Sequence, residues 1–433
     1  LKTVFNFSSK TDFPLILSLK MPDQKKIIYI GNLLVRHGLT PTSISTLGEK
    51  LSELAPLIQS SDKINKVQRL FDMIFTILRH KGSIKVVLID TYSGIAFIYA
   101  FFSAMICRLY GINYIPIIRG GGLPEILLRK KSIANMVFLY AKINISPSKY
   151  MKLVFEKNGF RSEYLPNSID VAKYNFQHRL RTSPKLIWVR SFHKVYNPQM
   201  AIRVLFRLKA IKPDAVLYMV GPEKDGTMRD CKNLVANLGM ENSVFFTGIL
   251  TKEEWKTHAL QSDIFLNTTN FDNQPVSVLE AMALGLPIVS TNVGGLPYLH
   301  KNGYDAILTA KDDADAMVGS ILKILNSEKL SSQLSLRARK KAESFDWKKI
   351  KSSWEKILNI KNDSCVNNNE KINKNIYRRY MNERIFGKKW SNKNIGNLII
   401  HQEKLTISKQ LLKKNEINLE NNKILDVGCA GGD

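Results

Sequence analysis

The sequence predicts an α/β fold with two doubly wound Rossmann-like domains, a C-terminal helical extension and an incomplete third domain. Short apolar segments alternate with longer helical patterns along most of the 433 residues. Several of these segments are apolar throughout, which is typical of parallel strands that helices cover on both faces. The alternation occurs in two series, and a chain of this length suggests two to three domains.

The first series predicts an N-terminal domain over residues 1–170, with its core from about residue 25. Residues 1–20 are expected to be upstream sequence or a short extension. The apolar run Ile95–Cys107 is too short to span a bilayer and lies between two expected strands, so we expect a buried crossover helix there. The expected strands are Ile27–Ile30, Val86–Asp90, Tyr114–Ile118 and Lys142–Ile145.

The second series predicts a domain over residues 171–345, and helical patterns follow around Leu330–Ser344 and Trp347–Ile360. Right-handed crossovers place the loops that follow parallel strands along one edge of each sheet, where ligands bind. The expected strands are Leu186–Val189, Val216–Val220, Val244–Phe246, Ile264–Asn267 and Pro287–Ser290.

The net charge of +27, from 64 Lys and Arg against 37 Asp and Glu, favours an anionic partner. No nucleic-acid recognition motif is present, so we expect no nucleic acid partner. An anionic membrane surface and a merely Lys-rich composition both stay open. The cysteines Cys107, Cys231, Cys365 and Cys429 lack paired spacing, which predicts a reducing, cytoplasmic location. The basic charge extends this expectation to a peripheral place on the inner face of the plasma membrane.

Residues 262–303 read as strand, polar loop, helix, strand and Gly-Gly turn. The helix is expected to begin just after Pro275, so its unpaired backbone N–H groups favour a phosphate. The carboxylates of Asp272 and Glu280 lie eight positions apart, and carboxylates accept hydrogen bonds from sugar hydroxyls. Phosphate and hydroxyl groups together describe a nucleotide-sugar. The alternative is that Ser277 and Glu280 form a narrow solvated strip on a buried helix.

The residues expected to contact the nucleotide-sugar in this segment share one loop and one helix start. They are Asn273, Gln274, Pro275, Val276 and Ser277.

This segment resembles the donor site of glycosyltransferase family four, which contains retaining enzymes of the GT-B fold. The matching residues are Pro275–Ala283, Gly285, Pro287, Gly294 and Gly295. The resemblance implies that the two domains face a cleft. It also implies that the helix over residues 346–360 returns to the first domain.

The same resemblance implies roles for single residues. Glu280 is expected to hold the ribose hydroxyls, and Asp272, where the family usually has glutamate, is expected to face the donor sugar. The backbone after Pro275 would receive the diphosphate. Arg190, at the end of an expected strand, and Lys194 match the cations that hold this diphosphate. We therefore expect Asp272, Glu280, Arg190 and Lys194 to carry the chemistry.

Glycines and a cation after other strands complete the expected donor site. Gly31 follows the first strand, and Gly221 follows the strand Val216–Val220. Arg119 and Gly120 follow the strand Tyr114–Ile118; many relatives carry histidine where Arg119 stands, and an anionic acceptor or a phosphate is the alternative ligand for Arg119.

The spacing of Asp313 and Asp315 fits a metal-binding Asp-x-Asp pair, but both lie at the start of a helical run and complement its dipole instead. We expect no metal site. The family resemblance likewise implies no cofactor, with the nucleoside-diphosphate sugar acting as donor substrate.

The chain ends in a second motif, after an Asn- and Lys-rich linker over residues 361–375. Residues Asp426, Gly428 and Gly432 resemble the first motif of class I S-adenosylmethionine methyltransferases. Residues 376–433 are therefore expected to be the truncated beginning of such a domain. S-adenosylmethionine would bind only if a complete methyltransferase domain exists.

The expected function is retaining transfer of a hexose to a lipid-linked or polysaccharide acceptor of the cell envelope. A GT-B-fold sugar-nucleotide epimerase, a bifunctional glycosyltransferase-methyltransferase of which this chain is a fragment, and a basic binding protein are the alternatives.

Overall fold

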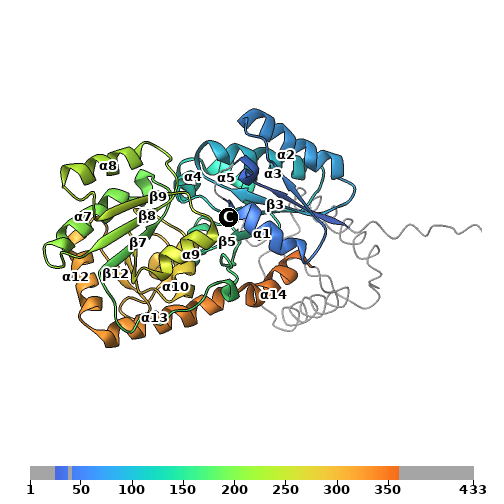
Figure 1. Cartoon of the computed structure of the whole chain (residues 1–433). Helices are drawn as coiled ribbons and strands as arrows, with labels where there is room; N and C mark the ends of the chain where they lie inside the picture. Colours follow the sequence, from blue (N-terminus) through green and yellow to red (C-terminus); the bar gives the residue numbers. More distant parts are fainter. Residues whose placement is uncertain (1–24, 38–40, 360–433) are drawn as a thin grey trace, which may run out of the picture. The chain divides into compact units, whose positions relative to one another are not determined.

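The computed structural model describes residues 25–37 and 41–359 (Figure 1). Within them the chain forms two six-stranded sheets in which every pair of neighbouring strands is parallel. The predicted α/β fold is confirmed. The expected linker over residues 361–375 and the expected methyltransferase beginning over residues 376–433 lie outside the described residues.

The first sheet has the order β2-β1-β3-β4-β5-β6. Its strands are apolar and buried at the centre of the sheet, as in β4, where every residue is buried. The bounds are β1 (Lys26–Ile30), β2 (Leu57–Ser60), β3 (Ile84–Thr91), β4 (Tyr114–Ile118), β5 (Asn144–Ser146) and β6 (Ser162–Tyr164).

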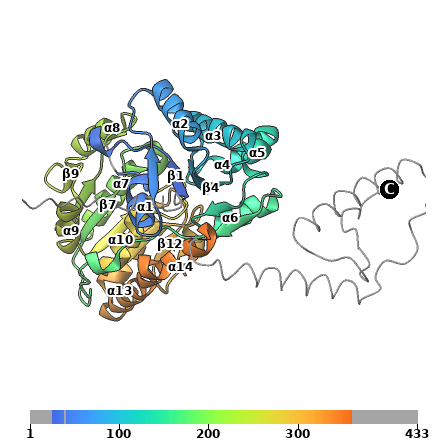
Figure 2. The same ribbon diagram turned by 90° about the vertical axis from the view of Figure 1, so that its right-hand side faces the viewer.

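Helices cover both faces of the first sheet. Five of them share one hydrophobic cluster with β1, β3 and β4: α2 (Lys66–His80), α3 (Phe97–Leu109), α4 (Leu123–Arg129), α5 (Lys131–Phe138) and α6 (Lys149–Lys157). Figure 2 shows these helices along one side of the sheet. The opposite face is covered by α1 (Ser43–Ser52) and, from the end of the described chain, by α14 (Trp347–Leu358).

The α14 helix packs on the first domain although it follows the second domain in sequence. Trp347 and Trp354 belong to the same cluster as Tyr29 of β1. The Trp347 indole N–H donates to Glu53 Oε2 at 3.1 Å. Asp346 caps the helix by accepting a hydrogen bond from the Lys348 amide at 2.8 Å.

The second sheet has the order β12-β11-β10-β7-β8-β9. The order reverses between β7 and β10, because the chain first adds β8 and β9 on one side and then returns to add β10 on the other. The bounds are β7 (Lys185–Val189), β8 (Val216–Val220), β9 (Val244–Gly248), β10 (Ile264–Asn267), β11 (Ile288–Thr291) and β12 (Ile307–Thr309).

The second sheet is also covered on both faces. One face packs against α7 (Pro198–Lys209), α8 (Thr227–Asn237) and α12 (Ala314–Leu325). The other packs against α9 (Lys252–Leu260), α10 (Val276–Leu284), α11 (Leu296–Leu299) and α13 (Glu328–Ala342). Single 3-10 turns complete the described chain: η1 (Val35–His37), η2 (Gly94–Ala96), η3 (Val171–Lys173), η4 (Lys194–Tyr196) and η5 (Glu343–Phe345).

Every strand expected from the sequence is present. The structure adds three strands that the sequence did not predict: β2, β6 and β12. All three lie at the edge of a sheet. Edge strands are covered less completely than central ones, so their residues do not form the continuous apolar runs that identified the others.

The expected buried crossover helix is buried on one face only. In α3, Phe97, Ala104 and Cys107 are buried, whereas Ile98 and Phe102 are exposed. None of the helices in the described part of the chain combines the length and the apolar character needed to cross a membrane.

Candidate functional site

The loops after β7 and β10 meet at the point where the strand order of the second sheet reverses. In open parallel sheets, ligands bind outside the carboxyl ends of the strands at such a reversal. Arg190 directly follows β7, and Asp272 lies in the loop after β10. The topology therefore brings together two residues that the sequence placed 82 positions apart.

Arg190 and Asp272 form an ion pair through Nη2 and Oδ2. The Arg190 guanidinium also lies over the ring of Tyr196, 4.9 Å from its centroid. The second carboxylate oxygen of Asp272 accepts a hydrogen bond from the Asn273 amide at 2.8 Å. Burial raises the pKa of Asp272, and the Arg190 charge and the Asn273 amide oppose this rise.

Gly221 lets the end of β8 approach Arg190. Its φ of 145° lies in a region that L side chains rarely adopt, and a Cβ there would lie 1.9 Å from the Arg190 carbonyl oxygen. The backbone of Arg190 donates to the Val220 carbonyl at 3.0 Å. The predicted donor residue Gly221 thus holds Arg190 in place through close backbone packing.

The α10 helix begins directly after Pro275, as the sequence predicts. Among the described residues no side chain caps this end, so the first amide N–H groups of Val276 and Ser277 are available to an anion. Val276 is exposed. The hydroxyl oxygen of Ser277 is buried and has no hydrogen-bond partner among the described residues.

Glu280 is not part of a solvated strip: its side chain is only 5% exposed. Its Oε1 atom forms an ion pair with the Lys252 ammonium group, and the Tyr174 hydroxyl donates to the same oxygen at 2.9 Å. Burial and the adjacent Glu280 carboxylate raise the pKa of Tyr174 well above its usual range. The carboxylate keeps Oε2 as a further acceptor within one turn of Ser277.

The Gly294–Gly295 turn supports the loop that carries Asp272. A Cβ on Gly294 would lie 2.2 Å from the Asp272 carbonyl oxygen, and a Cβ on Gly295 would lie 1.8 Å from the Asn273 carbonyl oxygen. The Gly295 amide donates to the Asp272 carbonyl at 2.8 Å. Residues larger than glycine here would push the loop away from the strand end.

Asn273 and Gln274 connect the α10 loop to the first domain. Ser148 Oγ donates to Asn273 Oδ1 at 3.1 Å. Asn167 donates twice to Gln274: its amide to Oε1 at 2.6 Å and its side-chain Nδ2 to the backbone carbonyl at 2.9 Å. Asn273 and Gln274 also line a cavity of about 510 Å³ that includes residues of both domains, such as Tyr164. Both predicted donor residues are buried, and the observed contacts are positioning contacts.

Arg119 is engaged inside the first domain rather than pointing to open solvent. Its guanidinium donates to Asp90 Oδ1 at 2.8 Å, to Asn167 Oδ1 at 2.7 Å and to the Tyr29 hydroxyl at 3.3 Å. Burial lowers the pKa of Arg119, but Asp90 and Tyr29 raise it by more, so the guanidinium stays charged. Asp90 binds Nε, and Nη1 and Nη2 each keep one further N–H, so a ligand role for Arg119 stays a prediction.

The other predicted donor residues lie at loop ends with different surroundings. Gly31 follows β1, and a Cβ on it would lie 3.1 Å from Asp90 Oδ2. Gly120 packs so closely on the Ser93 amide that a Cβ would lie 2.3 Å away. Lys194 is exposed and begins the turn η4.

The turn that contains Lys194 packs against the loop after β10, since the Asn270 amide donates to the Val195 carbonyl at 2.7 Å. Lys194 is therefore on the donor side of the second sheet, near the loop that leads to Asp272. Its side chain is exposed to solvent.

Sequence reasoning missed Lys252, Tyr174 and Asn167. Each contacts the predicted site only through the tertiary fold: Lys252 from the start of α9, and Tyr174 and Asn167 from the segment that connects the two domains. No local pattern distinguishes them from surface residues. The order of strands and helices along the chain could have indicated Lys252. In that order α9 precedes β10, and α9 packs beside α10 in the fold.

Asp313 caps α12, where its Oδ1 accepts from the Ala316 amide at 2.8 Å. Asp315 pairs with Arg207 at 2.9 Å. Across residues 25–37 and 41–359, no group of three or more His, Cys, Asp or Glu side chains is arranged to hold a metal ion.

The second domain matches a known protein family. The family model described as "Glycosyl transferases group 1" matches residues 170–341, which contain Arg190, Asp272 and Glu280. The likeness to this family therefore covers that part of the chain.

Two characterised relatives show the same likeness over part of the chain. The N-acetyl-alpha-D-glucosaminyl L-malate synthase of Bacillus anthracis is 28% identical over 218 residues, 49% of this chain and 54% of that protein. The amylovoran biosynthesis glycosyltransferase AmsK of Erwinia amylovora is 31% identical over 118 residues, 26% of this chain and 29% of that protein. The chain thus spans about half the length of these relatives or less.

Solved structures confirm the predicted GT-B fold. The Anabaena protein HepE, solved in complex with UDP and glucose, has a TM-score of 0.64 at 15% identity and covers 78% of this chain and 100% of its own. The sucrose-phosphate synthase of Thermosynechococcus elongatus has a TM-score of 0.64 at 14% identity and covers 78% of this chain and 98% of its own. At these identities the likeness concerns the fold alone.

Proposed function

We propose that this chain, whose residues 170–341 match the group 1 glycosyl transferases, is a retaining, metal-independent hexosyltransferase. It takes a hexose from a nucleoside-diphosphate sugar and transfers it to a lipid-linked or polysaccharide acceptor of the cell envelope. It works in the cytoplasm at the inner face of the plasma membrane.

The observation that carries this proposal is the arrangement around the start of α10. An uncapped helix N-terminus lies next to the Arg190–Asp272 ion pair at the reversal of the strand order. A buried carboxylate, Glu280, lies one turn further along the same helix. Amide N–H groups and a guanidinium bind a diphosphate, and a carboxylate binds ribose hydroxyls.

In the proposed complex, the donor diphosphate accepts hydrogen bonds from the Val276 and Ser277 amides and from the Ser277 hydroxyl. Arg190 shifts part of its bonding from Asp272 to the phosphate oxygens. Glu280 accepts from the ribose hydroxyls through Oε2 while Lys252 and Tyr174 hold Oε1. The Asp272 carboxylate accepts a hydrogen bond from a hydroxyl group of the hexose.

The chemical step breaks the bond between the hexose C1 and the phosphate oxygen and forms a bond between C1 and the acceptor oxygen on the same face of the sugar. The acceptor hydroxyl gives its proton to the leaving diphosphate. The negative charge that develops on this diphosphate is stabilised by Arg190, by the α10 amides and by Lys194. Fixed cations and amides therefore perform the charge stabilisation.

A donor screen tests the proposal. The full chain is incubated with UDP-, GDP- and ADP-hexoses, and the thermal unfolding midpoint is measured. We expect one nucleotide class to raise the midpoint, and uridine is the first choice because HepE was solved with UDP. No shift with any nucleotide-sugar at millimolar concentration would contradict the proposed donor site.

A transfer assay then separates transfer from epimerisation. A radiolabelled donor hexose is incubated with the protein, with and without a lipid-linked glycan acceptor. Label appearing in the acceptor, with the anomeric configuration of the donor, supports a retaining transferase. Release of a free or epimerised sugar without any acceptor would instead identify a sugar-nucleotide epimerase.

A further inference from the structure

The outer surface of helices α2–α5 is unusually apolar for a face that contacts water; we call it the α2–α5 face. More than half of the large hydrophobic side chains that are exposed in the described chain lie between residues 64 and 153. On the opposite side of the same sheet, α1 and α14 are packed around a buried cluster. The exposed apolar surface is therefore concentrated on one side of the first domain.

The α2 helix is apolar on two opposite faces. Met73 and Ile77 are buried against the sheet. Val67, Phe71 and Phe75, offset by half a turn, are 62–65% exposed. A surface helix in water normally carries polar residues on its outer face. Val67, Phe71 and Phe75 follow one another at intervals of four residues and so form one stripe.

The α3 helix beside it carries a second stripe. Ile98, Phe102 and Leu109 of α3 are exposed at intervals of four and seven residues, and the exposed Ile95 lies in η2 just before the helix. The two helices are neighbours, because the Tyr99 hydroxyl of α3 donates to the Lys66 carbonyl of α2 at 3.2 Å. Exposed apolar side chains on two neighbouring helices are typical of a site of interaction with a protein or a membrane.

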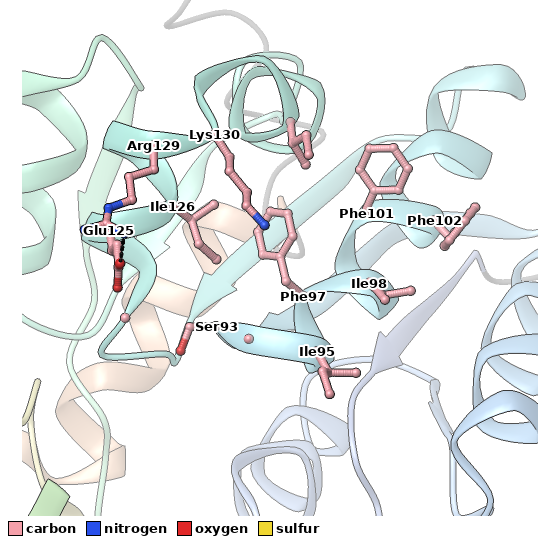
Figure 3. Close-up of a pocket in the computed structure, with 13 residues that line it drawn as sticks. Ser93, Ile95, Phe97, Ile98, Phe101, Phe102, Glu125, Ile126, Arg129 and Lys130 are labelled. Carbon is pink, nitrogen blue, oxygen red and sulfur yellow. Dashed lines mark ion pairs between the residues drawn. The ribbon is translucent and has the colours of Figure 1, made fainter.

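A groove opens on the same face between α3 and the pair α4 and α5. It has a volume of about 840 Å³ and is lined mainly by apolar side chains, among them Phe97, Phe101 and Ile126. Figure 3 shows Phe101, Phe102 and Ile98 along α3 on one side of the groove and Ile126, Arg129 and Lys130 on the other.

Exposed cations occur along the same stretch of the chain as these apolar stripes. Between residues 63 and 140, which the structure describes in full, Glu125 is the one exposed acidic residue, and it pairs with Arg129. Two cations stack on exposed aromatic rings at the border of the face: Lys81 over Tyr110 at 4.9 Å and Arg108 over Tyr140 at 3.8 Å. The exposed basic residues of this stretch are Lys63, Lys66, Arg79, Lys81, Arg108, Arg129, Lys130 and Lys131.

We propose that the α2–α5 face docks on an anionic phospholipid bilayer, with its apolar stripes inserted at the level of the headgroups and its cations bound to lipid phosphates. The apolar side chains match the acyl-chain region of a bilayer, and the Lys and Arg side chains match its anionic headgroups. Nearly all of the exposed charge on the face is positive. A protein partner would need acidic and apolar groups arranged to match this face. An anionic bilayer offers negative headgroups and apolar acyl chains over its whole surface. The link between this docking face and a lipid-linked acceptor rests on the proposed function.

The docking face is connected to the candidate donor site. The groove begins at Ser93 and Gly122, in the loops after β3 and β4. The adjacent Gly121 packs on the ring of Phe271, so closely that a Cβ would lie 2.6 Å away. Phe271 precedes Asp272. An acceptor anchored in the bilayer would thus enter along the groove toward the donor sugar.

Vesicle sedimentation tests the docking. The full chain is mixed with vesicles of phosphatidylcholine and phosphatidylglycerol in about a three-to-one ratio, and with vesicles of phosphatidylcholine alone. We expect sedimentation with the anionic vesicles and a marked decrease with the neutral ones. The double variant Phe71→Ser with Phe75→Ser is expected to reduce binding by about tenfold or more, since two exposed aromatic anchors are removed.

A control variant replaces two exposed apolar residues of the second domain by serine. Phe206 on α7 and Leu336 on α13 are each 47% exposed and lie in the second domain. The variant Phe206→Ser with Leu336→Ser is expected to bind vesicles as the unchanged protein does. Circular dichroism of both variants verifies the fold, which the exposed positions leave intact.

A second variant and its control test the contribution of the basic residues to vesicle binding. Arg129→Gln, Lys130→Gln and Lys131→Gln together are expected to reduce affinity for anionic vesicles by about tenfold or more and to weaken its dependence on salt. The control Lys323→Gln with Lys329→Gln changes exposed cations of the second domain and is expected to have no effect.

Three results would overturn the docking proposal. The first is no binding of the unchanged protein to anionic vesicles at low salt, and the second is equal loss in the Phe71/Phe75 variant and its control. The third is a concentration-dependent dimer, measured by light scattering, that the Phe71/Phe75 variant abolishes, because a second copy would then cover the face. Donor binding is measured separately in the thermal screen without lipid, so failure of docking and failure of the proposed function are distinguished.

Discussion

The guanidinium of Arg190 and the carboxylate of Asp272 form an ion pair across the reversal of strand order in the second sheet. The pair exists because β7 and β10 are neighbours in the sheet although β8 and β9 separate them in the chain. It places a cation and a carboxylate beside the free N-terminus of α10. Under the proposed function, a diphosphate bound there competes with Asp272 for the guanidinium.

Replacing Arg190 by glutamine should lower kcat by about 100-fold or more, because removal of one preorganised donor to a developing anion costs that much. Donor affinity should change less, since the α10 amides remain. Steady-state kinetics and donor titration check both values. Arg203→Gln, an exposed change on α7, is the control. Equal losses of kcat and thermal stability would show that Arg190 only supports the fold.

Replacing Glu280 by glutamine should weaken donor binding by about 10- to 100-fold, because hydrogen bonds to a charged acceptor contribute about 1.5–3 kcal/mol. Lys252 is half exposed and can be solvated, so the fold should persist. Isothermal titration with the donor measures the change. Glu253→Gln, an exposed acidic residue that pairs with Lys256, should bind the donor normally. Unchanged donor affinity in folded Glu280→Gln would refute the ribose role.

Asn167 positions the loop before α10, so Asn167→Ala should reduce both the stability and the donor affinity. The substitution removes the side-chain hydrogen bond to the Gln274 carbonyl and leaves Arg119 with one acceptor fewer. The loss in the free energy of unfolding should be about 1–3 kcal/mol. Urea unfolding and donor titration are the measurements. A purely structural role predicts normal KM for the donor in the folded variant, whereas a positioning role predicts a raised KM.

Arg119 and Asp90 form a buried pair in which the side chains are 7% and 0% exposed. Arg119→Leu should therefore destabilise the protein by about 3–5 kcal/mol, because Asp90 keeps an unpaired buried charge. The double variant Arg119→Leu with Asp90→Asn should recover part of this loss. Urea unfolding tests both. A stable Arg119→Leu protein that fails to bind the donor or acceptor would instead support the ligand role that the sequence predicts.

His300 makes stability depend on pH. Burial lowers the pKa of His300 below its usual value, although the adjacent Asp305 opposes this. The unfolded chain therefore binds a proton at a higher pH than the folded chain, and the free energy of unfolding should fall as the pH drops through about 6.5. Urea unfolding between pH 8 and pH 5 measures the slope. His300→Gln should flatten it over this range; the same slope in that variant would assign it to another group.

The sequence predicted the central strands of both sheets because each is a short apolar run between helices, as in Tyr114–Ile118 and Ile264–Asn267. It missed β2, β6 and β12 because edge strands have mixed polarity, as in Ser162–Tyr164. It placed the start of α10 correctly, since Pro275 and the apolar run after it are local signals.

Residues whose surroundings arise only from the fold could not be predicted. Glu280 reads locally as a helix glutamate, and the contacts that bury it come from Lys252 and Tyr174, 28 and 106 positions away. Arg119 reads locally as a free cation after a strand, and its engagement by Asp90 requires the register of β3 beside β4. Neither of these contacts can be predicted from the spacing of residues along the chain.

The position of the donor diphosphate is tested most directly by a crystal structure of the full chain with UDP. We expect the phosphate oxygens within about 3 Å of the Val276 and Ser277 amides, with Arg190 turned from Asp272 toward them and the ribose at Glu280. A nucleotide bound elsewhere, with the Arg190–Asp272 pair unchanged and the start of α10 in contact with solvent alone, would contradict the proposed donor site.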